Sequence, residues 1–292
     1  NEVLMKASKL INSMLLAGSL IASGQLLAQA DYSNGNIQTI PVRGNISMLI
    51  GAGGNIGVSA GDDGILIIDD QFAPLADKIR AAIADLGSDT PKFLLNTHFH
   101  GDHTGSNADF GMNSIIVAHE NVRSRLIGEN SPASALPVVT FDDDVTVHFN
   151  GEDITLIHMP AGHTDTDSVV MFSGSNVIHM GDHFFNGGFP FVDMANGGTV
   201  QGYLNNLEKA LSWIGDDTAV VPGHGPLGTK QDLLDFYNVV KDTSTTIRVM
   251  KSQQMSKEEI VAEGLDAQYE SWGQGFINEQ RWIETVFDSY PR

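Results

Sequence analysis

Apolar residues near the start of the chain gather into short runs that glycine-rich turns separate. Runs at residues 46–50, 55–58 and 65–68 predict strands, because brief apolar segments bounded by turn residues are typical of buried strands. The glycines between 51 and 54 indicate a hairpin turn rather than a phosphate-binding loop, since no Lys-Ser/Thr pair follows them. Residues 37–70 therefore predict an all-β beginning.

From residue 74 onwards, helical and strand patterns alternate. Apolar residues three or four positions apart predict helices over 74–87, 121–126 and 200–214, with a last helix that includes 283–290. Thr229 with Asp232, and Ser256 with Glu259, have the spacing of capping boxes, so two further helices are expected to begin there. Apolar runs predict strands at 93–96, 115–118, 145–149, 154–159, 168–172, 176–180 and 218–221.

The elements form one continuous series without a linker or a low-complexity tract. Residues 31–292 therefore predict a single domain, whose C-terminal third is helical and is interpreted as packing alone. A helix, a strand and a histidine-containing loop follow one another at 75–103 and again at 200–224. Two similar halves that face each other would bring both loops to one edge of a β-sandwich.

Charge and cysteine content exclude several classes of partner and chemistry. The chain has 16 Lys and Arg against 36 Asp and Glu, a net charge of −20, so its surface repels nucleic acid and anionic lipid. The partner expected instead is a small-molecule substrate. The chain has no cysteine, which excludes disulfides, thiolate ligands and a cysteine nucleophile.

The first 30 residues have the pattern of a signal peptide. Lys6 and Lys9 precede an apolar stretch from about Leu10 to Gly24, and Ala28-Gln29-Ala30 is a small-x-small cleavage site. The apolar stretch is shorter than the roughly 20 residues of a membrane span. We therefore expect residues 1–30 to be removed and the mature protein to be periplasmic or secreted, with no membrane attachment.

Four metal-ligand side chains lie within six residues, directly after the predicted strand at 93–96: His98, His100, Asp102 and His103. Residues two apart in extended backbone point to the same side, so His98 and His100 are placed to bind one ion together. Asp102 and His103 follow Gly101, where the backbone is free to turn, and are better placed for a second ion. The spacing therefore predicts two adjacent metal ions.

Three more candidate ligands also follow apolar strands: His163, Asp182 and His224. Strand ends at one edge of a sheet converge, so these side chains are expected to complete the site. Imidazole and carboxylate ligands without a thiolate suit zinc, and also iron or manganese.

In the sequence from residue 45 to 228, His98-x-His100-x-Asp102-His103, Gly162-His163-Thr164, Gly181-Asp182 and Gly223-His224-Gly225 resemble the motifs of the metallo-β-lactamase superfamily, in the same order. The resemblance implies an α/β fold, the four-layer αββα sandwich. It implies that His98, His100 and His163 bind a first Zn²⁺. It further implies that Asp102, His103 and His224 bind a second, that Asp182 bridges the two, and that Asp69 is a structural acid beside them.

Asp182 stands where the best-known β-lactamases of this superfamily carry a cysteine. A bridging aspartate is instead similar to glyoxalase-II-like thioesterases, lactonases and phosphodiesterases. The resemblance thus implies a binuclear zinc-dependent hydrolase that cleaves a small ester, lactone or amide, β-lactams included. The attacking group would be a hydroxide shared by the two ions, with Asp102 orienting it.

Two other classes of function stay open at this point. The same ligands suit iron, as in redox enzymes of the superfamily that resemble sulfur dioxygenases, and metal analysis distinguishes that class. A non-catalytic periplasmic zinc-binding or relay protein is the other, and lack of turnover by metal-replete protein would favour it. The substrate, the native metal and the oligomeric state are not indicated.

Some residues near the motifs have no assigned role. His183 adjoins Asp182 and either reaches the pocket or, as we expect, supports the site from behind or faces solvent. His119 ends a strand at the same edge, and we do not expect it to be a direct ligand. Residues 184–199 are aromatic, glycine-rich and aperiodic. They form either a substrate-lining loop or a plain surface connection.

Overall fold

The computed structural model describes residues 35–291. The predicted signal peptide, residues 1–30, lies outside the described residues. Within 35–291, none of the helices is both long enough and apolar enough to span a membrane.

The first half of the described chain forms a seven-stranded sheet in which the spatial order follows the sequence. Its strands are β1 (Gln38–Arg43), β2 (Ile46–Ile50), β3 (Ile56–Gly61), β4 (Gly64–Ile68), β5 (Phe93–Leu95), β6 (Ile115–His119) and β7 (Val139–Phe141). Strands β1 to β4 pair antiparallel through short turns, whereas β4 to β7 run parallel and are joined by helical crossovers.

The second sheet has six strands, in the order β13-β12-β11-β10-β9-β8. They are β8 (Asp144–Phe149), β9 (Glu152–His158), β10 (Ser168–Phe172), β11 (Val177–His179), β12 (Ala219–Val221) and β13 (Gly228–Thr229). All neighbours pair antiparallel except β11 and β12, which are parallel. Strands β9, β11 and β12 consequently point in the same direction.

The central strands of the first sheet are buried on both faces. Leu66 and Ile68 pack against the second sheet, in a core that includes Phe172. Ile65 and Ile67, which alternate with them along β4, pack with Ile79 of helix α1 (Ala76–Ala84) on the opposite face. Side chains alternate between the two faces along a strand, so the continuous apolar run of β4 indicates a sheet that is covered on both sides.

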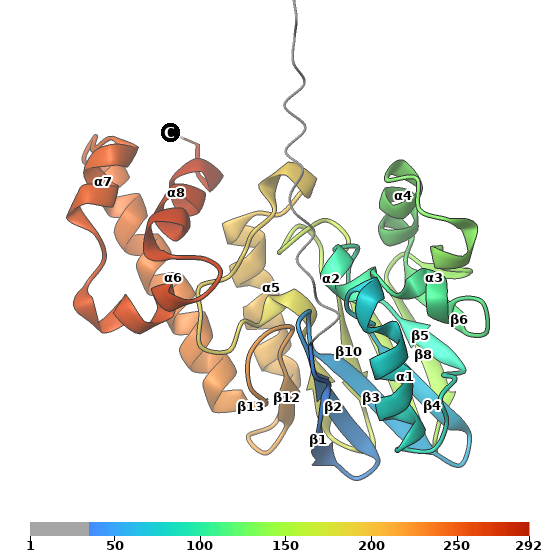
Figure 1. The fold of residues 1–292 in the computed structure, drawn as a ribbon. Coiled ribbons are helices and arrows are strands. Elements are labelled where there is room, and N and C mark those ends of the chain that lie inside the picture. Colours follow the sequence, from blue (N-terminus) through green and yellow to red (C-terminus); the bar gives the residue numbers. More distant parts are fainter. Residues whose placement is uncertain (1–34, 292) are drawn as a thin grey trace, which may run out of the picture. The chain divides into compact units, whose positions relative to one another are not determined.

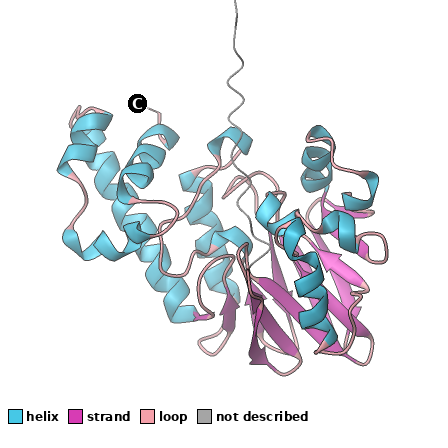
Figure 2. Cartoon of the chain, in the orientation of Figure 1, coloured by secondary structure: helices cyan, strands magenta, loops and turns pink. Residues whose placement is uncertain are grey.

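Helices cover the outer face of each sheet, which gives four layers (Figures 1 and 2). Beside the first sheet lie α1, α3 (Asn107–Phe110) and α4 (Glu120–Gly128); α2 (Gly101–Thr104) is a single turn after β5. Over the second sheet lie α5 (Val200–Trp213), α6 (Lys230–Ser252), α7 (Lys257–Glu263) and α8 (Glu279–Ser289). Trp282 and Phe236 of these helices are buried in one core with Ile178 and Val220. The predicted αββα sandwich is confirmed.

The predicted elements are present with small changes at their ends. Both expected capping boxes form, at Thr229 and at Ser256. The structure adds elements that no pattern indicated: β1, β7, β13, α2 and α3, besides short 3₁₀ turns.

Candidate metal centre

The predicted ligands lie where strands of the two sheets end. His98, His100 and the α2 residues Asp102 and His103 follow β5 in the first sheet. In the second sheet, β9, β11 and β12 point in the same direction, so the loops after them meet at one edge. Those three loops carry His163, Asp182 and His224. All seven side chains are brought together.

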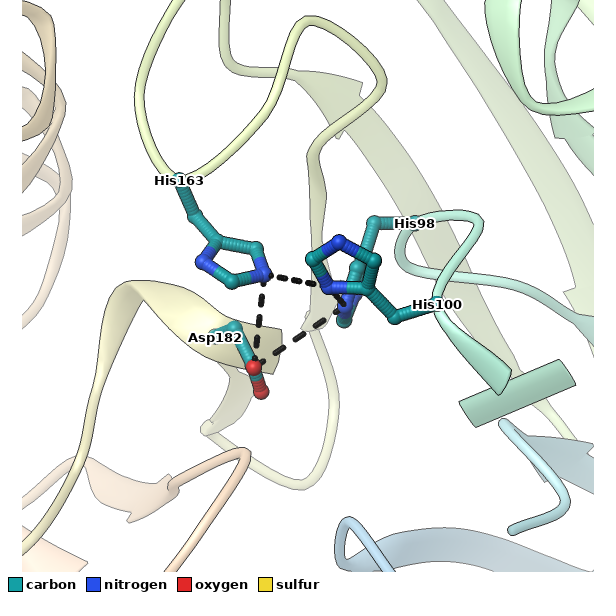
Figure 3. A group of neighbouring side chains, drawn as sticks. All are labelled: His98, His100, His163 and Asp182. Atoms are coloured by element: carbon teal, nitrogen blue, oxygen red, sulfur yellow. Dashed lines mark hydrogen bonds and ion pairs between the residues drawn. The ribbon is translucent and has the colours of Figure 1, made fainter. Parts of the chain in front are cut away.

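The first group consists of His98, His100, His163 and Asp182 (Figure 3). His100 Nδ1 lies 3.1 Å from His98 Nε2 and 2.9 Å from His163 Nε2. Asp182 Oδ2 lies 3.4 Å from His163 Nε2 and 3.9 Å from His98 Nε2. Three imidazole nitrogens and one carboxylate oxygen therefore face a common point.

The second group, Asp102, His103 and His224, adjoins the first. His224 Nε2 lies 3.4 Å from His103 Nε2 and 3.3 Å from Asp102 Oδ2. The other oxygen of Asp182, Oδ1, lies 3.0 Å from His103 Nε2 and 3.4 Å from His224 Nε2. Asp182 thus faces the first group with one oxygen and the second group with the other.

The outer hydrogen bonds of the first group determine which ring nitrogens carry protons. His163 Nδ1 donates to the carbonyl oxygen of Phe191 at 2.7 Å, and His100 Nε2 donates to Asp193 Oδ2 at 3.0 Å. A neutral imidazole has only one N–H, so in the neutral form that binds a metal ion His163 Nε2 and His100 Nδ1 both carry lone pairs. Two lone pairs that face each other at 2.9 Å repel unless a cation lies between them.

Asp69 sets the orientation of two more rings from beneath. Its Oδ2 accepts a hydrogen bond from His103 Nδ1 at 2.8 Å and another from the Thr97 hydroxyl at 2.7 Å. The Thr97 oxygen in turn lies 3.0 Å from His98 Nδ1 and accepts its proton. The Nε2 atoms of His98 and His103 are thereby directed at the centre, as the structural role expected for Asp69 requires.

Burial and charge act in opposite directions on the histidines. Burial lowers the pKa of His98 well below its ordinary value and that of His163 to about 4, so both rings are neutral near pH 7. Burial also opposes protonation of His224, but the charge of Asp182 and hydrogen bonds to Asp102 and Asp182 outweigh it and raise its pKa to about 9. The second group therefore has a strong affinity for positive charge.

The buried negative charge of Asp182 and the distances between the donor atoms of the two groups both fit divalent metal ions. Burial by itself would raise the pKa of Asp182. The charges of the nearby His103 and His224 lower it by more, so the net pKa lies well below its ordinary value and the carboxylate is ionised. Within 35–291, its Oδ1 atom is buried and has no hydrogen-bond partner. Ligands about 2.0–2.1 Å from a tetrahedral zinc ion lie about 3.3 Å apart, close to most of the separations above. The His/Asp cluster is compatible with divalent metal.

Two glycines make room for these side chains. A Cβ atom on Gly54 would lie 2.1 Å from His103 Cε1, and one on Gly223 would lie 2.2 Å from Asp182 Oδ1. On the sequence alone Gly54 was interpreted only as part of a turn. Its additional role is to let His103 approach the backbone.

A cavity of about 710 Å³ opens beside the centre. Its metal-centre residues are His100, Asp102, Asp182 and His224, and its remaining walls are mainly phenylalanine and glycine. Residues 185–191 supply much of the wall, so the 184–199 segment lines the cavity rather than forming a plain surface connection. Gly275 and Phe276 also line it. The interpretation of the C-terminal third as packing alone was therefore wrong.

The other histidines near the strand ends are not part of either group. His183 is buried rather than facing solvent; its Nε2 accepts a hydrogen bond from Asn206 Nδ2 at 3.0 Å, and burial lowers its pKa to about 3. His119 stacks on His158 with the ring centroids 3.7 Å apart. His183 does not line the cavity and packs in the interior, and His119 is packed against His158.

Asp193 is a polar residue of this centre that sequence reasoning missed. It lies 93 positions from His100, to which it is hydrogen bonded, and no strand or motif precedes it. The aromatic and glycine-rich composition of 184–199 was the only signal that this segment approaches the centre.

Comparison with known proteins places the fold and this site in one family. The model of the Metallo-beta-lactamase superfamily matches residues 51–224, well over half of the chain. The chain belongs to the metallo-β-lactamase superfamily. That membership confirms the resemblance inferred from the motifs.

Among curated relatives, the hydroxyacylglutathione hydrolase of Polaromonas sp. is 31% identical over 134 residues, 45% of this chain and 47% of the relative. The 2,4-dinitroanisole O-demethylase subunit alpha of Nocardioides sp. is 26% identical over 194 residues, 65% of this chain and 58% of the relative. The matches to the first curated relatives span about half of their length.

Solved structures of metallo-β-lactamases share the fold at low identity. The enzyme from Pontibacter korlensis superposes with a TM-score of 0.62 at 16% identity, over 70% of this chain and 99% of that one. The DIM-1 enzyme gives 0.60 at 18% identity, over 71% of this chain and 98% of that one. At such identities the likeness concerns the fold alone.

Proposed function

We propose that this protein is a binuclear metal-dependent hydrolase, with zinc as the native ion, that cleaves a small ester, lactone or amide. The observation that carries the proposal is the pair of ligand groups that share Asp182 through its two oxygens. Divalent ions bound there would polarise the substrate carbonyl and activate water as the nucleophile. Hydrolase names among the relatives agree with this class of reaction.

Asp102 is the residue best placed to handle the proton. Its side chain is 27% exposed and lines the cavity, whereas His103 beside it is fully buried. Burial by itself would raise the pKa of Asp102. The charge of His103 and a hydrogen bond to His224 lower it by more, so the net pKa lies below its ordinary value and the ionised carboxylate can accept a proton. We infer that Asp102 orients the attacking water and accepts its proton.

The cavity argues against a glutathione thioester, although several relatives are named hydroxyacylglutathione hydrolases. Glutathione carries two carboxylates that need cationic partners. Among the described residues that line the cavity there is no lysine or arginine. The proposal therefore stays with small esters, lactones and amides.

The test is a metal analysis of protein purified without added zinc, followed by assays on ester, lactone and β-lactam panels. We expect close to two zinc ions per chain, and a loss of at least about 100-fold in kcat/KM for the Asp102→Ala, His103→Ala double variant. His148→Ala, an exposed histidine outside both groups, is the matched control.

Two results would overturn the proposal. Iron with redox activity would favour the alternative class of enzyme in this superfamily. Full metal occupancy without turnover on any panel would favour a metal-binding or relay protein.

A further inference from the structure

Five phenylalanines form the walls of the cavity beyond the metal centre: Phe72, Phe185, Phe189, Phe191 and Phe276. In the described part of the chain, the ionisable residues that line the cavity all belong to the centre itself. A charged substrate group that extends away from the centre would lose its hydration against these rings without gaining an ionic partner. An apolar group there would gain free energy from leaving water.

Two of the phenylalanines also pack on ligand rings. Phe185 stacks on His224 with centroids 5.1 Å apart and an interplanar angle of 15°. Phe191 contacts the rings of His100 and His163 at centroid distances of 5.9 and 5.7 Å. These side chains hold the centre in place as well as lining the cavity, so changing them would disturb both.

Phe276 differs because it contacts none of the ligands in the described structure and is 72% exposed. It meets Phe191 edge to face, with centroids 6.0 Å apart, and so extends the aromatic wall outwards. It also lies outside residues 51–224, the part of the chain that the superfamily model matches. The rim of the cavity is therefore built by the chain's own C-terminal segment.

Arg281 is the cation that approaches this rim. Its guanidinium carbon lies 4.9 Å from the centroid of the Phe276 ring, and its Nη1 atom donates to the Phe276 carbonyl oxygen at 3.2 Å. Arg281 thus supports Phe276 from within the segment. A substrate with an anionic end would pair with Arg281.

We propose that the substrate carries an uncharged apolar acyl or aryl group, bound along the phenylalanine wall, and that Phe276 determines this specificity. The proposal rests on the hydrolase function proposed above and adds the chemical class of substrate. Phe276, whose side chain is largely exposed, would be covered when the apolar group binds.

The first test compares 4-nitrophenyl acetate, butanoate and hexanoate with 4-nitrophenyl hydrogen adipate, using metal-replete protein. We expect kcat/KM to rise about three- to fourfold per added methylene, since each buried methylene contributes about that factor. The adipate, which has a hexanoate-length chain ending in a carboxylate, should be at least about tenfold poorer than the hexanoate. Equal or faster turnover of the adipate, lost in Arg281→Ala, would overturn the proposal.

The second test removes the rim ring. Phe276→Ala should lower kcat/KM by about tenfold for the hexanoate and only about twofold for the acetate, while Phe276→Leu should lose about threefold at most on the hexanoate. Met112→Ala is the matched control, because Met112 is equally exposed, at 72%, and lies outside the cavity lining. Equal losses on both esters would contradict a specificity role.

A third measurement separates failure of this inference from failure of the proposed function. If metal-replete protein hydrolyses nothing in the ester, lactone and β-lactam panels, the hydrolase proposal fails, and the cavity is examined by fluorescence titration with neutral N-phenyl-1-naphthylamine. Roughly tenfold weaker binding of this probe by Phe276→Ala than by Met112→Ala would still support the apolar site. Equal binding by the two variants would overturn it.

Discussion

Two aspartates that are not in either ligand group hold histidine rings from the side that faces away from the centre. Asp69 accepts from His103, and Asp193 accepts from His100. Asp193 is itself held by Asn196, whose Nδ2 donates to Asp193 Oδ2 at 2.6 Å. Carboxylates in such positions fix the tautomer of a ligand and increase its basicity. The precision of the centre therefore depends on residues beyond the donor atoms.

Replacing Asp193 with alanine should weaken metal binding about 10- to 100-fold, because His100 loses the partner that directs its Nδ1 atom. Competition with a chromophoric chelator measures the affinity. Asp193→Asn keeps an acceptor without the charge and should fall between the alanine variant and the wild type. Asp153→Ala is the control, since Asp153 pairs at 2.7 Å with His148, an exposed histidine outside the centre. Unchanged affinity in Asp193→Ala would exclude this positioning role.

At this scale, the donors and the supporting Asp69 could be predicted from the sequence and its motifs, whereas the supporting Asp193 could not. His98, His163 and Asp182 each follow an apolar strand, so local pattern indicates where the side chain emerges. Asp193 and Phe276 lie in segments without periodicity, and their places depend on contacts between distant parts of the chain. Such contacts leave no regular signal in one sequence.

Among the elements, those with a strong internal pattern were predicted and short or exposed ones were missed. Helices α5 and α6 have apolar residues at helical spacing and capping residues at their starts. Strand β1 is a largely exposed edge strand that contains Pro41, so it lacks the apolar run that marks a buried strand. Helix α2 has only four residues, too few for apolar residues at helical spacing to mark it in the sequence.

The capping box of α6 provides a prediction at the scale of an element. Thr229 Oγ1 accepts from the Asp232 amide at 3.2 Å, and Asp232 Oδ2 accepts from the Thr229 amide at 2.8 Å. Thr229→Ala leaves one amide of the first turn without its partner and should lower the free energy of unfolding by about 1 kcal/mol.

Urea denaturation measures the effect as a lower midpoint at constant slope. Thr246→Ala, in the same helix, removes an exposed hydroxyl that bonds only to the Asp242 carbonyl and should change stability by less than about 0.5 kcal/mol. Equal losses in the two variants would show that the cap is not the cause.

For the whole molecule, the order of strands and helices indicated a β-sandwich and the resemblance in the motifs implied its four layers, whereas the cavity was not predictable. The cavity wall combines the segment after β11 with Phe276, which lies about 90 residues further along the chain. Which substrate fits depends on how these segments meet. How these segments meet is determined only when the layers of the fold pack together, so it cannot be read from either segment alone.

Removal of bound metal should destabilise the whole molecule. Without ions, the lone pairs of the ligand histidines face one another and Asp182 stays buried and ionised. An ion at 100 times its dissociation constant contributes about 2.7 kcal/mol, so chelation should lower Tm by about 5–10 °C. Scanning calorimetry before and after EDTA, with zinc restored as the control, measures this. The same Tm in all three samples would contradict the coupling.

Each proposed ion takes donors from both sheets. His98, His100, Asp102 and His103 come from the half of the chain that ends with β7, and His163, Asp182 and His224 come from the half that begins with β8. Neither half holds a complete set, so full coordination requires that both have folded and docked face to face. Metal uptake would then be the last step of maturation. A chain that carries both ions would be one whose two sheets have already folded and packed against each other correctly.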